Sequence, residues 1–375
     1  MQDNSSLKKL VYISSIAASH QVKFCNSLRK YYQAHFIFYD YPDNTRGNWW
    51  RVSLGMCCEV LDNTYFKNGL FAGRYYSRDL IKKLNQINPD IIMIGGFSIP
   101  SNYFAYKWAT KNNKRTIVFT ERSRTKKGEL RGRTIIWSII KWIYRDIDLI
   151  LVSADDAITQ FRDTFGFGDK VMVARYAADI DDYYTHPIRK KKNAYTYIYA
   201  NRLTEIYNPL LAIVIFGEII KKYPESKLLM NNDGELKQDC LLKIRELNIE
   251  KHVFFLDNLQ SWSDLNTVYK ESDILILPAK FSNGNFTILE AMASGMGVVI
   301  SDKILGVGNL IKDGVNGFNR SPEVKSFINA IEQYISDENL FKVHAEINRD
   351  ITKPLSAEGT AKTFHEIISK KLNIK

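Results

Sequence analysis

Short apolar runs alternate with helical patterns along the whole chain. In the first half, continuous apolar runs typical of buried strands occupy residues 10–13, 36–39, 90–94, 116–119 and 149–152. A helical pattern covers residues 21–31, between the first two of these runs. Alternation of this kind implies a parallel sheet that is covered by helices on both faces. We therefore expect an α/β fold in the first half.

The second half repeats this rhythm. Its predicted strands occupy residues 195–199, 227–230, 253–256, 274–277 and 298–300, and helices such as 210–222 and 236–247 lie between them. The segment from His186 to Asn193 contains a proline and four consecutive cations, which is typical of a solvated linker. It predicts a boundary between two similar α/β domains, with a ligand bound in the cleft between them.

Candidate binding residues follow three predicted strands of the first half. They are His20, the pair Gly95 and Gly96, and Glu121. In a parallel α/β sheet, ligands collect at the carboxyl ends of the strands, so these residues are candidates for a binding pocket. His20 also fits the alternative of an ordinary loop residue, since a lone histidine usually is one.

The stretch from Ser282 to Ser301 predicts a polar loop, then an apolar-periodic helix, then a strand. A helix that starts directly after a Gly/Asn loop presents unpaired backbone N–H groups and the positive end of its dipole, which favours an anion such as a diphosphate. Glu290 lies one turn into this helix and would repel phosphates, so it is better suited to a pair of sugar hydroxyls. The alternative is an ordinary βα unit with a surface glutamate.

Length and composition indicate the class of protein. A chain of 375 residues is too long for one compact core and fits two domains. Hydrophobic residues make up 45% and charged residues 25%, which is typical of a soluble globular protein and excludes disorder as a class. The four cysteines lack the spacing of a disulfide framework, and the adjacent Cys57 and Cys58 do not favour a bridge. We therefore expect a reducing compartment.

The start of the chain has the outline of a signal peptide, because Lys8 and Lys9 precede the apolar run LVYISSIAA. Two serines interrupt that run, which favours a first buried strand instead. No run in the sequence approaches the ~18 apolar residues that a membrane span needs. Any membrane contact is therefore expected to be peripheral.

The formal net charge of +11 is concentrated in one segment. Between Lys107 and Arg145, twelve cations accompany two glutamates, and such a patch favours an anionic partner. Residues 133–145 have an apolar pattern that fits a core helix or a helix lying shallowly in a membrane. The two interpretations are compatible if a different face of the helix serves each role. The second interpretation places the region from Arg122 to Arg145 on an anionic membrane surface. Nucleic acid is not expected as a partner, because the aromatic residues are not interleaved with the cations.

Five motifs occur in order in the second half. They are NRL at 201–203, NDGEL at 232–236, SDILILP at 272–278, LEAMASG at 289–295 and DGVNGF at 313–318. Together they resemble glycosyltransferase family four, the retaining GT-B enzymes of bacterial polysaccharide and glycolipid assembly. The resemblance is strong from Tyr195 to Phe318. It is weaker in the first half, where residues 19–24 resemble the first loop of capsule and O-antigen transferases.

The resemblance implies a GT-B fold, in which two Rossmann-like domains face each other across a cleft with their parallel sheets. Residues 1–187 would bind the acceptor, residues 188–355 would bind the nucleotide sugar, and residues 356–375 would form a helix that returns to the first domain. The implied reaction transfers a sugar, with retention of configuration and without a metal, to a hydroxyl of a glycan or lipid-linked acceptor in surface polysaccharide synthesis. Such an enzyme would be cytoplasmic and peripheral on the inner face of the cell membrane.

The resemblance also assigns roles to residues. Arg202 would contact the donor diphosphate, Glu290 would bind the nucleotide ribose, and Glu121 and His20 would complete the catalytic set. The remaining donor contacts would come from Asn201, Ser282, Asn283, Gly284, Asn285, Phe286, Thr287 and Ile288. No cofactor is implied beyond the nucleotide sugar, whose base stays open. No metal site is expected, because Arg202 and the helix start would neutralise the diphosphate.

Three positions depart from the family pattern. The family's glutamate eight residues before Glu290 is Ser282, the lysine five residues after Arg202 is Tyr207, and the first-domain histidine is Glu121. Loss of the lysine removes a charge-assisted contact worth about 1.5–3 kcal/mol.

Two interpretations of these departures stay open. In the first, the chain is an active transferase in which His20, Arg122 or Arg124 supplies the missing contacts. In the second, it is a non-catalytic GT-B scaffold that binds a nucleotide or a partner, or a nucleotide-sugar epimerase or hydrolase. Turnover of the donor with and without an acceptor separates these functions.

Overall fold

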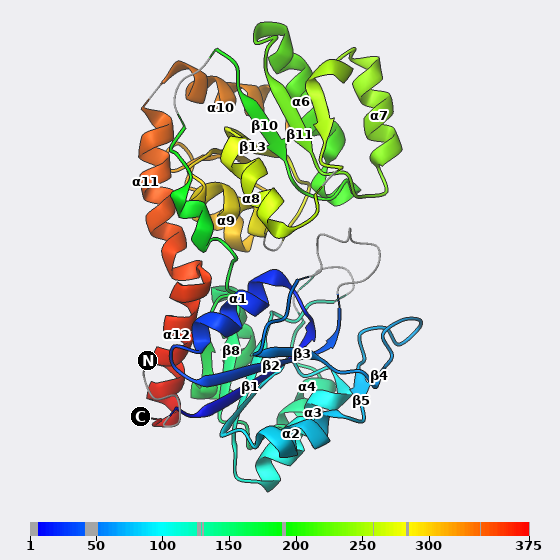
Figure 1. The fold of residues 1–375 in the computed structure, drawn as a ribbon, viewed down its shortest axis with the longest axis vertical. Coiled ribbons are helices and arrows are strands. Elements are labelled where there is room, and N and C mark those ends of the chain that lie inside the picture. The colour runs from blue at the N-terminus through cyan, green and yellow to red at the C-terminus, as the bar shows by residue number, and fades with distance from the viewer. Residues whose placement is uncertain are drawn as a thin grey trace. The chain divides into compact units, whose positions relative to one another are not determined.

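The computed structural model divides the chain into two compact units (Figure 1). It describes residues 7–41, 52–125, 129, 131–189, 193–257, 259–282, 285–337 and 339–374. The first unit contains the described residues up to Ala177 and those from Ala357 onward, and the second contains Ala178–Ser356. Each unit is an α/β domain built around a parallel sheet, as the alternating pattern predicted.

The sheet of the first unit has the strand order β3-β2-β1-β6-β7-β8-β9. Its strands are β1 (Lys9–Ile16), β2 (Gln33–Asp40), β3 (Cys58–Val60), β6 (Ile91–Gly95), β7 (Arg115–Thr120), β8 (Leu149–Val152) and β9 (Val171–Val173). Successive residues face opposite sides of the sheet, so Tyr12 joins one apolar cluster while Val11 and Ile13 join another. Burial on both faces explains why the strands read as continuous apolar runs.

Helices and a small hairpin surround this sheet. They are α1 (Ser19–Leu28), α2 (Leu80–Ile87), α3 (Pro100–Lys111), α4 (Ile135–Ile143), α5 (Asp155–Thr159), α12 (Ala357–Leu372) and the hairpin of β4 (Thr64–Tyr65) and β5 (Tyr76–Ser77). Although α12 comes last in the chain, Phe364 on this helix packs against Phe24 and Phe119, with ring centroids 4.9 and 5.2 Å apart. The last helix therefore contributes to the core of the first unit.

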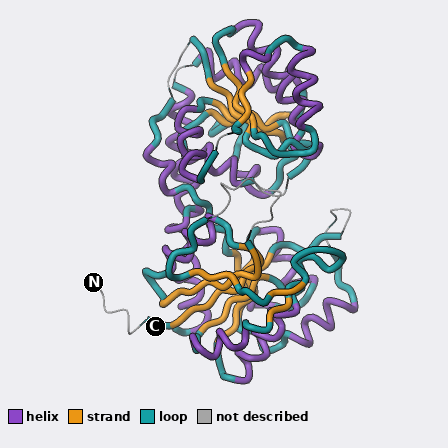
Figure 2. Tube along the Cα trace, turned by 45° about the vertical axis from the view of Figure 1, so that its right-hand side comes forward, coloured by secondary structure: helices purple, strands orange, loops and turns teal. Residues whose placement is uncertain are grey.

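The second unit has a sheet with the order β12-β11-β10-β13-β14-β15. Its strands are β10 (Thr196–Tyr199), β11 (Lys227–Met230), β12 (Val253–Phe255), β13 (Ile274–Leu277), β14 (Gly297–Ser301) and β15 (Phe318–Arg320). Its α-helices are α6 (Pro209–Lys222), α7 (Lys237–Glu246), α8 (Trp262–Glu271), α9 (Phe286–Ala293), α10 (Val324–Ser336) and α11 (Leu340–Thr352). In both units, helices enclose the strands (Figure 2).

The strands predicted from apolar runs are all present. Those that the sequence did not predict are the two strands of the hairpin and the edge strands β3, β9 and β15. Each of these edge strands has only three residues. Such short strands give a weak pattern, and of the three-residue strands only β12 was predicted, within the apolar run 253–256.

The prediction of a solvated linker is wrong at His186 and Arg189, which are only 3% and 6% exposed. The two ring nitrogens of His186 are hydrogen-bonded to Ser294 Oγ at 2.6 Å and to Asn266 Oδ1 at 3.1 Å. The segment therefore packs into the second unit. Residues 190–192 lie outside the described residues.

The burial of Arg189 has a local cause. Its guanidinium donates hydrogen bonds to the backbone carbonyls of Tyr269 and Lys270 in the last turn of α8, and to the carbonyl of Ser294 at the end of α9. Helix C-termini carry unsatisfied carbonyl groups and negative partial charge, which stabilise a cation there. Burial lowers the pKa of Arg189 to about 10, which leaves it charged near neutral pH.

The two units divide between Ala177 and Ala178, ten residues before the boundary that the sequence suggested. The reason is that Ile180 and Tyr183 are buried in the apolar cluster of the second unit. A charge run marked the boundary in the sequence, whereas packing decides it in the structure.

Candidate functional site

The order of the second sheet changes direction between its two central strands. From β10 the chain proceeds to β11 and β12 on one side, and β13 is followed by β14 and β15 on the other. The carboxyl ends of β10 and β13 thus form a topological switch point, where ligands of open α/β sheets bind. Asn201 and Arg202 follow β10, and the loop that contains Ser282 connects β13 to α9. Predicted donor-binding residues from distant motifs therefore meet at one edge of one sheet.

Glu290 is a buried carboxyl on α9 and is only 8% exposed. Its Oε2 accepts a hydrogen bond of 2.6 Å from the hydroxyl of Tyr269 on α8. Burial raises the pKa of Glu290 to about 7, Asp179 contributes in the same direction, and the hydrogen bond from Tyr269 opposes the rise. The alternative of a surface glutamate is therefore wrong. Burying an ionisable carboxyl costs free energy, and a buried carboxyl with a raised pKa is typical of a functional site.

Tyr269 was not singled out in the sequence. Its side chain is fully buried, and burial followed by the neighbouring Glu290 carboxylate raises its pKa, so it remains a hydrogen-bond donor. Tyr183 packs against it edge-on, with ring centroids 5.4 Å apart. The available signal was its position shortly before the SDILILP motif.

Two asparagines of the predicted donor site carry buried atoms without a hydrogen-bond partner among the described residues. These atoms are Oδ1 of Asn201 and Nδ2 of Asn285. Each residue is 8% exposed. Buried polar atoms are nearly always paired in folded proteins, so an acceptor and a donor left over at the switch point favour a polar ligand.

The start of α9 differs from the expectation. Asn285 is the N-cap, its Oδ1 accepts a hydrogen bond of 3.1 Å from the backbone N–H of Thr287, and its carbonyl accepts one of 3.1 Å from Ile288. These two N–H groups, which were expected to bind the diphosphate, are thus used by the cap in this structure. Asn283 and Gly284 lie outside the described residues.

Arg202 forms a two-point ion pair with Asp233, which lies in the loop after β11. Its Nε lies 2.9 Å from Oδ2 and its Nη2 lies 3.4 Å from Oδ1. Both side chains are about half exposed, with 49% for Arg202 and 40% for Asp233. The pair holds the guanidinium at the switch point, where an anionic ligand can still reach it.

A glycine allows this loop to approach Arg202. Gly234 has a φ of +144°, and a Cβ added there would lie 2.4–2.6 Å from the backbone of Leu203. The backbone N–H of Leu203 donates to the carbonyl of Asp233 at 2.7 Å, and the N–H of Leu236 donates to the carbonyl of Leu203 at 2.8 Å. Only a residue without a side chain fits this contact. The glycine of the NDGEL motif therefore positions the partner of Arg202.

Tyr207, which stands in place of the family's lysine, supplies no positive charge to the site. Tyr207 is partly buried against the apolar cluster of the second unit. A different lysine lies next to this position: the backbone N–H of Lys280 donates to the carbonyl of Ile206 at 2.8 Å, and its Nζ lies 3.0 Å from Oε1 of Glu205. Lys280 follows β13, so the fold brings a cation close to the place where the motif lacks one.

In the first unit, the candidate residues also share one sheet edge. β1, β6 and β7 are neighbours, and the strand order changes direction between β1 and β6. His20 is the second residue of α1 and is half-buried, while Gly96 and Glu121 directly follow β6 and β7. Burial, and then the carboxylate of Glu121, raises the pKa of the Tyr176 hydroxyl. Tyr176 is therefore a neighbour of Glu121 that the sequence did not indicate.

α4 has one buried face and one exposed face, so an entirely interior helix is excluded. Trp137 is 6% exposed and stacks on Phe165 at 3.8 Å. The other face exposes four large apolar side chains, Ile135 (81%), Ile136 (59%), Ile139 (51%) and Trp142 (66%). Arg133 and Arg145 are exposed at the two ends of this face, and Arg145 lies over the ring of Trp142 at 5.6 Å.

Two further observations concern the membrane expectation. Within the described part of the chain, no helix combines the length and the apolar character that spanning a bilayer requires. The cations Lys126 and Lys127 of the basic segment lie outside the described residues.

Residues 184–351 match the family described as glycosyl transferases group 1. This segment covers nearly all of the second unit. Over this segment the chain is similar to that family. The five motifs that suggested a glycosyltransferase all lie inside the matched segment, and so do Glu290, Tyr269 and Arg202.

Curated relatives include bacterial galactosyltransferases whose names refer to an undecaprenol-linked sugar or to lipopolysaccharide. The chain is 29% identical over 155 residues to an Escherichia coli UDP-Gal:alpha-D-GlcNAc-diphosphoundecaprenol alpha-1,3-galactosyltransferase, covering 40% of this chain and 39% of that protein. It is 29% identical over 156 residues to the lipopolysaccharide 1,6-galactosyltransferase of Salmonella typhimurium, covering 41% of this chain and 40% of that protein. The matches thus span about two fifths of these relatives' own length.

Solved structures show the fold. The Anabaena protein HepE in complex with UDP has a TM-score of 0.68 at 16% identity, covering 96% of this chain and 100% of that chain. A glycosyltransferase from Rickettsia africae has a TM-score of 0.71 at 14% identity, covering 98% and 100%. The chain therefore has the GT-B fold, with two Rossmann-like domains.

Proposed function

We propose that the chain is a glycosyltransferase that moves a sugar from a nucleotide-sugar donor to a hydroxyl of a glycan or lipid-linked acceptor in bacterial surface polysaccharide synthesis. The observation that carries this proposal is the buried Glu290 and Tyr269 pair at the switch point of the second sheet. Relatives that act on a diphosphoundecaprenol-linked sugar and on lipopolysaccharide support the acceptor class.

The donor half of the site follows from the second unit. Oε2 of Glu290 is held by Tyr269, and Oε1, which makes no hydrogen bond with the described residues, is left to accept from the ribose hydroxyls of the nucleotide. Asn201 Oδ1 and Asn285 Nδ2 supply a further acceptor and donor for the ligand. Each of these contacts uses a polar atom that has no hydrogen-bond partner among the described residues.

Leaving-group stabilisation rests on cations and not on a metal. Arg202 and Lys280 are exposed enough to turn from Asp233 and Glu205 toward the departing diphosphate. In this mechanism the configuration is retained, because the acceptor attacks from the face of the departing phosphate, whose oxygen takes the acceptor's proton. His20 and Glu121 act on the acceptor side, in the first unit.

Membrane association is the second part of the proposal. The exposed face of α4, with Ile135, Ile136, Ile139 and Trp142, inserts shallowly into the head-group region. Arg133 and Arg145 border this face and bind anionic lipid, with each cation contributing about 1 kcal/mol. A transferase with a lipid-linked acceptor gains from this position on the cytoplasmic face, because the acceptor's reducing end stays in the membrane.

Calorimetric binding of UDP-, GDP-, ADP- and CMP-linked sugars tests the donor half. We expect one class to bind, Glu290→Ala and Arg202→Ala to weaken it, and Glu246→Ala, which removes an exposed carboxylate of α7, to leave it unchanged. If no nucleotide sugar binds, or if Glu290→Ala binds as well as the wild type, the transferase proposal fails.

Turnover of the donor identified in this way separates the possible activities. A transferase consumes it mainly in the presence of a lipid-linked glycan, an epimerase or hydrolase consumes it equally without acceptor, and a scaffold binds it without turnover. The wild type should show the first of these patterns.

A further inference from the structure

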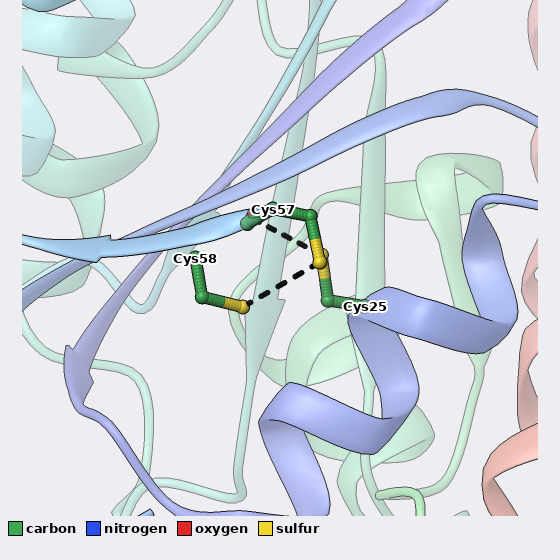
Figure 3. A group of neighbouring side chains, drawn as sticks. All are labelled: Cys25, Cys57 and Cys58. Carbon is green, nitrogen blue, oxygen red and sulfur yellow. Dashed lines mark hydrogen bonds between the residues drawn. The ribbon is translucent and has the colours of Figure 1, made fainter. Parts of the chain in front are cut away.

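Three cysteines that lie far apart in the sequence meet in the core of the first unit (Figure 3). Cys25 lies on α1, Cys58 is the first residue of β3, and Cys57 lies in the turn before that strand. Their sulfur atoms all lie within 4.8 Å of one another, and those of Cys57 and Cys58 are 4.0 Å apart. Among the described residues, this is the only group of three or more possible metal ligands of the His, Cys, Asp and Glu types.

The convergence depends on strand pairing. β3 pairs with β2 in parallel, with Phe36 opposite Cys58, and Cys58 therefore shares the face of the sheet on which Phe36 packs against Phe24 of α1. Adjacent residues of a regular strand point to opposite faces. Cys57 precedes the strand, so its side chain is free of that alternation and joins Cys25 and Cys58 in the same apolar cluster.

The spacing of the sulfurs suits a thiophilic metal ion. A zinc–sulfur bond is about 2.3 Å long, so the sulfurs of a tetrahedral site lie about 3.8 Å apart. The observed separations of 4.0 Å to at most 4.8 Å are close to this value. Soft thiolate ligands select ions such as zinc over magnesium or calcium.

Cysteine binds a divalent ion as a thiolate, and a bound cation favours loss of the thiol protons. Three thiolates buried without a cation would be strongly unfavourable, and a divalent ion removes most of that charge.

We propose that Cys25, Cys57 and Cys58 form a structural site for a closed-shell thiophilic divalent cation of the zinc class. The three sulfurs supply three of the four ligands of a tetrahedral ion. His35 does not complete the site, because it lies on the face of β2 opposite to Phe36 and is hydrogen-bonded to Glu59 at 2.7 Å.

The site fastens one end of the sheet. β3 has three residues, and among the described strands it pairs with β2 alone. A metal ion would connect it to α1, whose first turn carries His20. The site lies entirely in the first unit, and it is independent of the nucleotide site in the second.

Cadmium is a suitable probe, because thiolate-to-cadmium charge transfer is visible in the ultraviolet. The full-length protein, reduced and freed of metal, is titrated with Cd²⁺ and, in competition, with Zn²⁺. We expect one equivalent per chain in the wild type. Cys25→Ala, Cys57→Ala and Cys58→Ala should each weaken binding by more than about 100-fold, the upper end of what loss of an outer-shell partner costs.

Cys240→Ala is the matched control, because Cys240 is a single buried cysteine of the second unit. It should bind cadmium like the wild type, and so should Glu290→Ala, which keeps this test separate from that of the nucleotide site. Alkylation with N-ethylmaleimide, read by mass spectrometry, gives a second measurement that does not depend on how well a variant folds. Zinc should protect the three clustered thiols of the wild type and leave Cys240 unaffected.

Three results would overturn the proposal. They are absence of the charge-transfer band in the wild type, equal loss of binding in Cys240→Ala, and thiols that zinc does not protect. Rapid loss of two of the clustered thiols in air despite added zinc would also overturn it, and would indicate a disulfide pair.

Discussion

Glu290→Gln should make the protein more stable at neutral and alkaline pH while weakening its binding of nucleotide sugar. The folded-state pKa of Glu290 is about 7, raised from an ordinary value of 4.5. The folded protein therefore binds the proton more tightly than the unfolded chain does. The protonated Glu290 carboxyl therefore contributes to the free energy of unfolding. This contribution is fully present below pH 4.5 and is lost as the pH rises through 7.

The magnitude follows from the two pKa values. Each pH unit between them is worth about 1.4 kcal/mol, so ionisation of Glu290 costs the folded state about 3 kcal/mol above pH 7. Glutamine keeps the volume and can still accept the hydrogen bond from Tyr269, but it carries no charge. The variant should therefore escape this cost.

Urea denaturation of wild type and Glu290→Gln, at about pH 5 and about pH 8, measures this effect. The wild type should lose about 2.5 kcal/mol relative to the variant between the two conditions, because Glu290 is already mostly ionised in the unfolded chain at pH 5. Other titrating groups, such as the buried His186 and His344, are common to both proteins and cancel in the comparison. If the free energy of unfolding changed with pH in the same way for both proteins, the reasoning would be refuted. That result would mean that folding does not raise the pKa of Glu290.

Other consequences of the structure can be tested in the same way. Gly234→Ala should lower the free energy of unfolding by about 2–4 kcal/mol, because the added Cβ would meet the backbone of Leu203 at 2.4–2.6 Å. Gly314 is the control: it has a φ of +70° and open space around it, so Gly314→Ala should cost only about 1 kcal/mol. Ile139→Glu should reduce co-sedimentation with anionic vesicles, and Leu242→Glu, at an exposed apolar position on α7, should not; equal binding by both would remove α4 as the membrane face. The transfer rate should be the same with and without added Mg²⁺ or Mn²⁺, and a strict requirement for either would contradict the roles given to Arg202 and Lys280.

The candidate site shows which functional residues can be predicted from the sequence and which cannot. Glu290 and Asn285 were found from the sequence because a loop, a helix start and a carboxylate lie within ten residues, and local geometry follows from local spacing. Their partners were not found. Tyr269 comes from another helix, and Lys280 is adjacent to Ile206 only because β13 pairs with β10. Such contacts depend on which strands pair, which no local window contains.

By itself the sequence determined the α/β class, the parallel sheets and the resemblance to glycosyltransferases, because apolar runs record burial on both faces of a strand and the motifs keep a fixed order. Only the tertiary structure decided the environment of each charged or reactive group. It buried Arg189 under the ends of two helices where the charge run suggested solvent, and it brought Cys25 to Cys57 and Cys58. The physical reason is that solvation and proximity are properties of the whole packed chain, whereas residue type and spacing specify only what each segment can do.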